Sequence, residues 1–212
     1  MEPWLLFSEG DRMKLIIASN NTHKIAEIRA ILGDAFEEIH TLREAGIAID
    51  VVEDGDTFEQ NAVKKAIEVL AAAPGFDAAL ADDSGLEVDA LGGAPGVHSA
   101  RYAGEQHCDA DNNAKLMADM ADVPDGRRGC RFVSCAAFAL RGQAVITARG
   151  TVEGVLTKEP RGENGFGYDP YFYYAPFGCT FAEASAEQKN SVSHRKNALN
   201  ALRTLMAEHG IC

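Results

Sequence analysis

The sequence contains a pair of adjacent acidic residues, Asp82 and Asp83, directly after a short apolar run. Ser84 and Gly85 follow at once, and this dipeptide is typical of a turn. We therefore predict that the two carboxylates lie where a strand ends, at the edge of a sheet, where clefts form in α/β proteins. Paired carboxylates at such a place could hold a divalent metal ion or orient a water molecule. The alternative is an acidic turn that only ends a strand.

Ser19 to Lys24 forms a polar segment between an expected strand and an expected helix. Residues 14–18 contain a β-branched apolar run, and residues 24–32 place apolar side chains at helical spacing. The backbone N–H groups and the dipole of a helix start attract phosphate, and Lys24 adds a positive charge. The segment is thus a candidate phosphate site. It matches neither of the glycine-rich nucleotide-binding patterns, and an ordinary polar helix start is the alternative.

A second helix is predicted from Thr57 to about Pro74, because Thr57 and Gln60 match a capping box and apolar residues follow at helical spacing. Asn61 and Lys65 are four residues apart on this helix, so their side chains share one face. Both could point into one cleft. The alternative is that they are solvated on the exposed side of the helix.

The remaining pattern alternates strands and helices. It predicts strands at 78–81 and 86–91, a loop at 92–96, a helix at 109–120, a hairpin of strands 132–140 and 144–151, a long loop at 160–170 and a final helix from about 193. The long loop has the glycines and prolines of a binding loop. Lys189, His194 and Arg195 lie near the start of the final helix, where an anion could bind, although such residues are often surface charges. We predict an α/β fold with a mixed central sheet flanked by helices.

The composition argues against several classes of protein. A chain of 212 residues with 46% hydrophobic content is long enough for one large domain or for two small lobes that share a sheet, and we expect one folding unit. The net charge of −12 argues against a nucleic-acid partner. We also expect no membrane contact and a cytoplasmic location, because no apolar run approaches the roughly 18 residues of a membrane span and residues 1–12 lack the pattern of a secretory signal. The five cysteines lack metal-ligand spacing and are expected to be free thiols.

Six motifs occur in one fixed order and together identify a family resemblance. They are S-N-N-T-H-K, E-D-G-x-T-F, A-D-D-S-G-L, G-G-x-P-G-V-x-S-A-R-Y, G-F-G-Y-D-P-x-F and K-N-S-V-S-H-R. From about Met13 to the end of the final helix, the chain resembles the inosine/xanthosine triphosphate pyrophosphatase family. The resemblance implies a homodimeric α/β fold of two lobes with an intervening nucleotide-binding cleft. We therefore divide the chain into an N-terminal extension, residues 1–12, and a single pyrophosphatase domain, residues 13–212.

The resemblance also implies an activity and a set of site residues. The family uses Mg²⁺ to hydrolyse inosine, deoxyinosine and xanthosine triphosphates (ITP, dITP and XTP) to the monophosphate and pyrophosphate. Asp83 is implied as the proton acceptor, and Glu53 and Asp83 as the magnesium ligands. Asp82 would be a partner of the metal or of its water. The residues implied to bind substrate are Ser19, Asn20, Asn21, Thr22, His23, Lys24, Lys65, Ser84, Phe166, Gly167, Tyr168, Asp169, Lys189, His194 and Arg195.

Within that set, the residues implied to hold the triphosphate are Ser19, Asn20, Asn21, Lys24, Lys65 and Lys189. Those implied to hold the base are Phe166, Gly167, Tyr168, Asp169, His194 and Arg195. The chain departs from many relatives at His23, where they have glycine before the lysine of the first motif. Because glycine tolerates positive φ and histidine does so only at a cost, the loop conformation there can differ.

Two other functions fit parts of this pattern. One is a Maf-like nucleotide pyrophosphatase, whose chains also open with a strand and a serine-containing loop; that family has S-x-S-P-R-R there, which residues 19–24 do not match. The other is a catalytically silent nucleotide-binding module on the same scaffold, against which the presence of Lys24, Glu53 and Asp83 argues.

Overall fold

The structure is a computed structural model that describes residues 13–211, without the side chain of His23. The predicted extension at residues 1–12 lies outside the described residues, as does Cys212. The strands are β1 Lys14–Ile17, β2 Glu38–Thr41, β3 Ala78–Val88, β4 Gly129–Leu140, β5 Ile146–Leu156, β6 Phe172–Tyr174 and β7 Cys179–Thr180. The α-helices are α1 Thr22–Leu32, α2 Phe58–Ala72, α3 Asp109–Asp119, α4 Ala186–Val192 and α5 His194–Glu208. Short 3₁₀ turns occur at Gly33–Ala35, Asp89–Leu91, Gly96–Arg101 and Asp125–Arg127.

One mixed sheet contains all seven of these strands, in the order β2-β1-β3-β4-β5-β6-β7. β1 is parallel to both of its neighbours, so that Leu15 pairs with Ile39 of β2 and with Ala78 of β3. β6 is antiparallel to β5 and to β7. The predicted α/β fold with a mixed central sheet is therefore confirmed. Within residues 13–211, no helix combines the length and the apolar character needed to cross a membrane.

The described residues divide into two compact units. The first unit comprises residues 13–83, 135–150 and 195–211, and the second comprises residues 84–134 and 151–194. The strands β3, β4 and β5 each continue from one unit into the other. The single domain over residues 13–212 remains a prediction.

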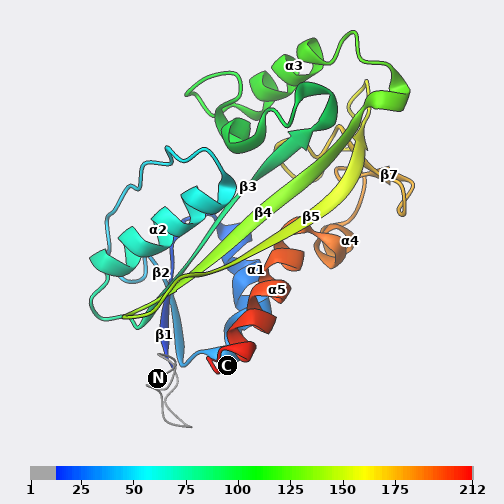
Figure 1. Ribbon diagram of the computed structural model, residues 1–212. Coiled ribbons are helices and arrows are strands. Elements are labelled where there is room, and N and C mark those ends of the chain that lie inside the picture. The colour runs from blue at the N-terminus through cyan, green and yellow to red at the C-terminus, as the bar shows by residue number, and fades with distance from the viewer. Residues whose placement is uncertain (1–12, 212) are drawn as a thin grey trace. The chain divides into compact units, whose positions relative to one another are not determined.

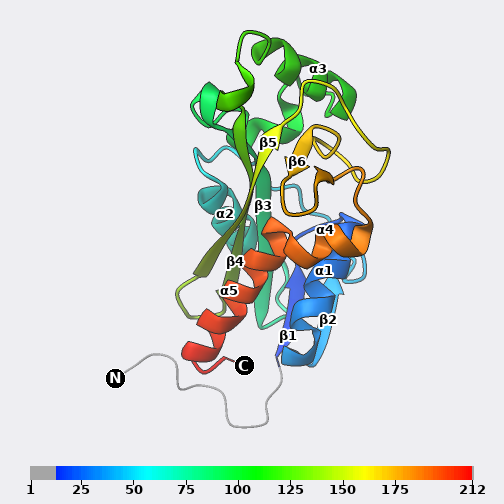
Figure 2. The same ribbon diagram turned by 90° about the vertical axis from the view of Figure 1, so that its right-hand side faces the viewer.

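Helices cover both faces of the sheet in the first unit. α1 and α5 lie against one face and α2 lies against the other (Figure 1 and Figure 2). Leu15 and Ile17 belong to the core with α1 and α5, and Ile16 points to the opposite face and is also buried. A parallel strand covered on both faces has to be apolar throughout, which explains the continuous apolar run in β1. This core also contains Ile28, Leu32, Phe36, Leu80, Phe138, Leu199, Leu202 and Met206.

Aromatic side chains form much of the core of the second unit. The ring centroids of Phe132 and Phe172 are 4.5 Å apart, and those of Phe172 and Phe181 are 4.8 Å apart. Leu116 and Met120, from α3 and the residue after it, pack into the same cluster. Tilted aromatic pairs at these distances each add roughly 0.5–1.5 kcal/mol beyond the burial of their area.

The acidic segment from Asp82 to Gly85 lies inside one continuous strand, β3. The predicted turn at Ser84 and Gly85 is therefore wrong, and so is the predicted sheet edge, because β3 lies between β1 and β4. Gly85 instead permits a close approach, since a Cβ atom there would lie 2.3 Å from Ser99 Oγ and 2.8 Å from Gly96 O. Leu86 N donates to Ser99 Oγ at 2.8 Å. A distant 3₁₀ segment thus accounts for a glycine that local patterns assign to a turn.

The predicted second helix is confirmed as α2, with a modified cap. Gln60 N donates to Thr57 Oγ1 at 3.1 Å, as a capping box requires. The Gln60 side chain, however, accepts from Asp56 N at 2.8 Å, one residue before the expected partner. The predicted helices at α1, α3 and α5 are also confirmed, with bounds shifted by one or two residues.

Helix α4 was not among the predicted elements, although its sequence carries a start signal. Ser185 Oγ accepts from Gln188 N, and the Gln188 side chain accepts from Ser185 N, which is a complete capping box. The predicted hairpin is confirmed as β4 and β5 and is longer than expected. The predicted strand at 86–91 ends at Val88.

Gly85→Ala should lower the free energy of unfolding by about 1–3 kcal/mol, the usual cost of overpacking, because the new Cβ would overlap Ser99 and Gly96. Gly126→Ala is the matched control, since a Cβ there has no heavy atom within 4 Å and its φ lies outside the left-handed region. Urea titrations measure both variants. A Gly85→Ala midpoint equal to that of the wild type would contradict the close approach.

Candidate active site

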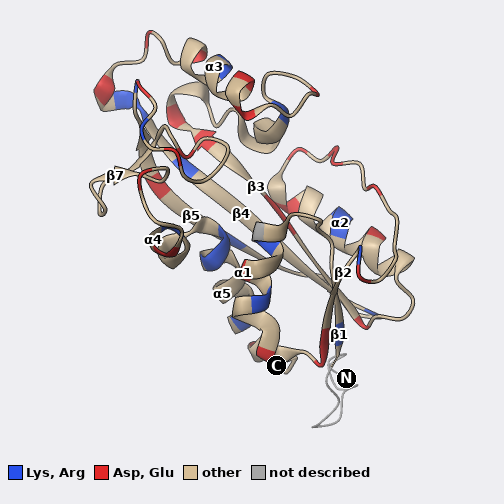
Figure 3. Ribbon diagram, turned by 180° about the vertical axis from the view of Figure 1, so that it is seen from behind, with Lys and Arg blue, Asp and Glu red and all other residues tan. Residues whose placement is uncertain are grey.

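The acidic pair on β3 lies just beyond the end of β1. Ile17, the last residue of β1, pairs with Leu80, and Ala18 N donates to Leu80 O at 2.8 Å. Asp82 and Asp83 therefore follow the carboxyl end of a parallel strand, which is where α/β sheets bind ligands. Figure 3 shows the acidic positions of β3 in red, in a sheet whose strands are mostly uncharged. The sheet register, and not a turn, places the two carboxylates.

Asp82 is a buried counter-ion for several cations of the first unit. Its side chain is 1% exposed, Lys24 Nζ lies 3.1 Å from its Oδ1 atom, and Arg195 Nε donates to its Oδ2 atom at 3.1 Å. Lys65 Nζ donates to its backbone oxygen at 3.2 Å. Burial would raise the pKa of Asp82, but the charges of Lys24, Arg195 and Lys65 outweigh it and hold that pKa well below its usual range.

Lys24 keeps a surplus of positive charge around it. Burial lowers the pKa of Lys24, the charge of Asp82 raises it, and the charges of Arg195 and Lys65 lower it again, so the net change is downward. The pKa of Lys24 is thus lowered mainly by burial, and the pKa of Asp82 is lowered by the charges of the cations around it. An additional anion beside Lys24 would relieve this crowding.

Glu27 is a second acidic partner of Arg195 that sequence reasoning missed. Arg195 is 3% exposed, and its Nη1 atom lies 3.3 Å from Glu27 Oε2. Glu27 lies three residues after Lys24 on α1, and that i,i+3 spacing on one helix face was the available signal. The prediction assigned Arg195 to the base, and the structure places its guanidinium between two carboxylates of the first unit.

Asp83 is oriented by α2. Asn61 Nδ2 donates to Asp83 Oδ2 at 3.0 Å, and Asn61 Oδ1 accepts from Gly55 N at 2.8 Å. Burial raises the pKa of Asp83, and the nearby charge of Glu53 raises it further. The charge of Lys65 and the hydrogen bond from Asn61 oppose that rise. Asn61 and Lys65 therefore share a face toward the acidic pair, as their spacing predicted.

Glu53 and Asp83 form a donor set that suits Mg²⁺. Lys65 Nζ lies 3.1 Å from Glu53 Oε1, and the charge of Glu53 acts on Asp83. Two neighbouring carboxylates, one of them buried, repel each other, and a divalent cation would relieve that repulsion. Over the described residues no group of three or more His, Cys, Asp or Glu could hold a metal ion. Mg²⁺ commonly uses one or two carboxylates and completes its shell with water and substrate phosphates, so the pair fits.

The polar segment before α1 uses part of its hydrogen-bonding capacity internally. Asn21 N donates to Ser19 Oγ at 3.1 Å, and Lys24 N donates to Asn21 Oδ1 at 3.2 Å. Asn20 and Thr22 are exposed. The side chain of His23 lies outside the described residues. The segment is a strand-to-helix junction, as predicted, and Lys24 links it to Asp82.

In the second unit, a lysine and an aromatic ring are held by a buried carboxylate. Lys189 Nζ lies 2.5 Å from Asp169 Oδ2 and 4.3 Å from the ring centroid of Phe166. Phe166 N donates to Asp169 Oδ2 at 2.9 Å. Burial raises the pKa of Asp169, while Lys189 and the Phe166 amide oppose the rise. The structure therefore brings three predicted site residues together within this unit.

The other predicted residues of the second unit are more buried. The Tyr168 hydroxyl donates to Ser99 O at 2.7 Å, and its ring belongs to the core. The buried His194 ring stacks on Phe132, with centroids 5.2 Å apart. Phe166, in contrast, is 48% exposed. Ser84 is half-buried and follows Asp83 on β3.

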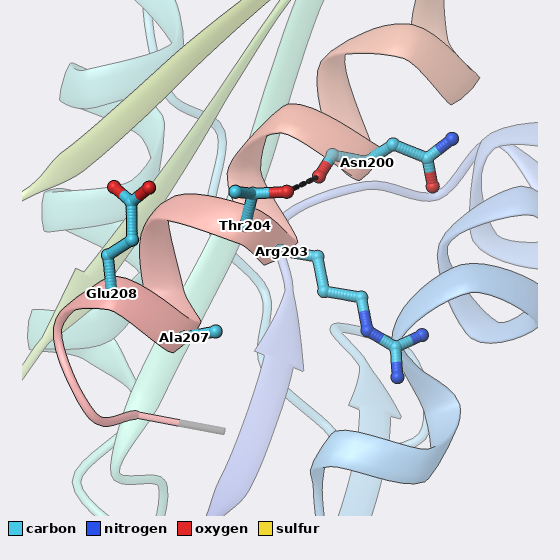
Figure 4. A pocket seen from close by; sticks show the side chains of 5 residues that line it. All are labelled: Asn200, Arg203, Thr204, Ala207 and Glu208. Atoms are coloured by element: carbon cyan, nitrogen blue, oxygen red, sulfur yellow. Dashed lines mark hydrogen bonds between the residues drawn. The ribbon is translucent and has the colours of Figure 1, made fainter.

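A surface hollow on α5 has no part in this cluster. Its lining residues come from α5 alone, as Figure 4 shows: Asn200, Arg203, Thr204, Ala207 and Glu208. Arg203 is engaged by the turn after α1, because it donates to Ile31 O and pairs with Asp34, both at 2.8 Å. None of the predicted site residues lines it.

A mixed α/β sheet that gathers lysines, an arginine and paired carboxylates at the end of a parallel strand defines an α/β protein with a charged candidate site. The family follows from comparison with known proteins. The model of the Ham1 family matches residues 15–205, and the chain belongs to this family. The resemblance identified from the six motifs is thereby confirmed.

Relatives and a solved structure agree along nearly the whole chain. The dITP/XTP pyrophosphatase of Leuconostoc mesenteroides is 48% identical over 90% of this chain and 94% of its own length. The dITP/XTP pyrophosphatase of Clostridium perfringens is 46% identical over 90% of this chain and 95% of its own. The structure of the Staphylococcus aureus Ham1 protein is 40% identical, with a TM-score of 0.82 over 92% of this chain and 98% of that chain.

Asp82→Asn should lower the free energy of unfolding by about 3–5 kcal/mol, because it leaves Lys24 and Arg195 without the anion that they share. The lowered pKa of Asp82 gives stability that is complete above its unfolded-state value of about 3.9 and is lost as the pH falls through the folded value. The difference from wild type should therefore be equal at about pH 7 and about pH 5.5. Chemical denaturation at both pH values measures it, and the exposed Asp122→Asn is the control. A difference that shrinks between them would contradict the lowered pKa.

Proposed function

We propose that this protein hydrolyses ITP, dITP and XTP to the nucleoside monophosphate and pyrophosphate, which removes deaminated purines from the nucleotide pool. The arrangement of Lys24 and Lys65 around the acidic pair on β3 carries the proposal, because it combines phosphate-binding cations with a carboxylate that can accept a proton. The names of relatives 46–48% identical over about 90% of the chain support the same reaction and substrates.

The proposed reaction breaks the bond between the α-phosphorus and the α–β bridging oxygen. Asp83 accepts the proton of a water molecule whose oxygen attacks the α-phosphorus, and Asn61 holds the Asp83 carboxylate in position. Lys24 and Lys65, with the segment from Ser19 to Lys24, bind the triphosphate and neutralise the negative charge that grows on the leaving pyrophosphate.

Mg²⁺ is the proposed cofactor, with Glu53 and Asp83 as its ligands. When bound, the ion would neutralise phosphate charge and polarise the reacting phosphoryl group. Asp82 does not share that role, because its carboxylate oxygens face Lys24 and Arg195. Its contribution is to hold these cations.

The second unit supplies the proposed base site. Phe166 offers an exposed ring for stacking, Gly167 follows it, and Asp169 accepts from its amide. Lys189, which the resemblance implies as a phosphate cation, lies beside the ring, with Nζ 4.3 Å from the centroid. Ser84, Tyr168 and His194 of this unit, and Arg195 of the first unit, complete the substrate-binding set that the family resemblance implies. Donors aimed at the 6-keto oxygen would accept hypoxanthine and xanthine and oppose the 6-amino group of adenine. We also propose the two-lobed fold with an intervening nucleotide-binding cleft that the family resemblance implies.

The proposal includes a homodimer, a cytoplasmic location, and no nucleic-acid or membrane partner. The dimer follows from the family resemblance, and the cytoplasmic location is the expectation stated from the sequence. The net charge of −12 opposes binding to nucleic acid. Light scattering of the purified protein measures the oligomeric state. Of the two other functions weighed on the sequence, the membership in the Ham1 family disfavours the Maf-like enzyme. The silent module predicts no turnover, which the assays below decide.

Pyrophosphate release tests the reaction directly. ITP with Mg²⁺ should yield the monophosphate and pyrophosphate, and a chelator should abolish the rate. ATP should be a poorer substrate by roughly 10⁴-fold in kcat/KM, the scale of discrimination when a site is organised around one hydrogen bond. Chromatography of the products over a panel of nucleoside triphosphates measures both. A diphosphate and orthophosphate as products would place the cleaved bond elsewhere.

Asp83→Asn should lower kcat by at least roughly 10², the contribution of a general base, while the similar size of asparagine preserves the fold. The exposed Asp122→Asn, which removes the same charge outside the cluster, should leave kcat unchanged. Steady-state kinetics with ITP, alongside circular dichroism of each variant, measure the effect. Near wild-type turnover of Asp83→Asn would show that another group accepts the proton.

A further inference from the structure

Two side chains of α3 hold both peptide groups of Gly167. Gly167 N donates to Asp109 Oδ2 at 2.7 Å, and Asn113 Nδ2 donates to Gly167 O at 2.8 Å. Asn113 Nδ2 also donates to Asp109 O at 2.9 Å, which ties the two α3 residues together. All of these contacts lie within the second unit. The backbone of one loop residue is thus clamped from both sides by a helix that precedes it by more than fifty residues.

The clamp depends on helical spacing and on the glycine. Asp109 and Asn113 are four residues apart in α3, so their side chains lie on one face of the helix. Gly167 has a φ of +61°, a left-handed conformation that side-chain-bearing residues rarely adopt. Neither α3 residue belongs to any of the six motifs that identify the family. Holding a loop residue of this kind costs conformational entropy, which the two hydrogen bonds offset.

The clamped residue directly follows Phe166, the exposed aromatic ring of the loop. Phe166 N is itself bound by Asp169, and Lys189 Nζ lies 4.3 Å from the ring centroid. The backbone on both sides of Phe166 is therefore anchored, on one side by Asp169 and on the other by α3. A ring that is 48% exposed gains little from core packing, so these backbone anchors determine where it lies.

We infer that Asp109 and Asn113 are positioning residues for nucleobase binding, which act by fixing the Phe166 ring through Gly167. The inference rests on the proposed function, because it takes Phe166 as the ring on which the base stacks. Stacking on a pre-positioned ring strengthens the ground state and the transition state alike. Loosening the clamp should therefore raise KM and leave kcat nearly unchanged.

The test compares charge-matched variants of α3. Asp109→Ala removes the acceptor of the Gly167 amide. Asp111→Ala removes the same charge from the same helical turn, where Asp111 Oδ2 accepts from Gln106 Nε2 at 3.4 Å. Asn113→Asp keeps the shape of the side chain and turns a carboxylate oxygen toward Gly167 O, which is repulsive. Circular dichroism melting identifies any variant that fails to fold. If one of the two clamp variants fails, the other one tests the inference.

Hydrogen exchange of the peptide that covers residues 165–171 reports the clamp without any substrate. Exchange should be about 5–10-fold faster in Asp109→Ala and Asn113→Asp, the range expected for one lost hydrogen bond, and unchanged in Asp111→Ala. KM for ITP and the Kd for inosine monophosphate should rise by a similar factor in the same two variants, with kcat within about twofold of wild type.

Each outcome separates the clamp from the reaction. Unchanged exchange in both clamp variants would overturn the inference. So would faster exchange with unchanged KM and Kd, because the loop would then be held for a reason other than the base. If the wild type binds inosine monophosphate and the clamp variants weaken that binding, the inference stands even where ITP is not hydrolysed and the proposed reaction fails. A wild type that binds no inosine monophosphate would overturn the inference, while release of pyrophosphate from ITP decides the proposed reaction separately.

Discussion

The burial of Asp82 is the constraint on which the charged site depends. A carboxylate that is 1% exposed stays ionised only if cations replace its water, and Lys24 and Arg195 do so at 3.1 Å each. Those cations come from α1 and α5, and Lys65 of α2 reaches the backbone oxygen of the same residue. Three helices that cover two faces of the sheet are thus tied to one position of β3. The cations that the proposed function needs for phosphate are held in place before any ligand arrives, which lowers the cost of binding.

Sheet register explains why this position is available. β1 is short and stops opposite Leu80, while its parallel neighbour β3 continues for eight more residues to Val88. The two acidic residues therefore lie within a regular, central strand, at positions beyond the point where the neighbouring strand β1 ends. A strand holds a carboxylate more firmly than a loop does, which suits a group that has to meet a water molecule and a metal ion with small tolerance. The continuation itself depends on Gly85, which lets Ser99 approach the backbone.

The second unit also contains a buried, ion-paired carboxylate, but this one positions a different kind of side chain. Asp169 is buried and pairs with Lys189, and its carboxylate also binds the amide of Phe166. The lysine then lies beside the Phe166 ring, and α3 holds the next residue. In the first unit a buried acid organises cations, and in the second a buried acid organises an aromatic ring. In each arrangement a buried carboxylate fixes the position of the groups around it. The proposed triphosphate site uses the first arrangement, and the proposed base site uses the second.

Local sequence determined the elements whose signals lie within a few residues: the apolar run of β1, the Thr57 cap of α2, the apolar stripe of α5, and the six motifs that identify the family. It also placed Asn61 and Lys65 on one face, because helical spacing is a local property. The tertiary structure alone decided that Asp82 to Gly85 forms a strand, that Tyr168 is a core residue, and that Glu27, Asp109 and Asn113 support the site. Those outcomes depend on partners from 13 to 168 residues away, such as Ser99 for Leu86 and Arg195 for Glu27. Spacing along the chain carries no information about such contacts, because they form only when the sheet and helices pack.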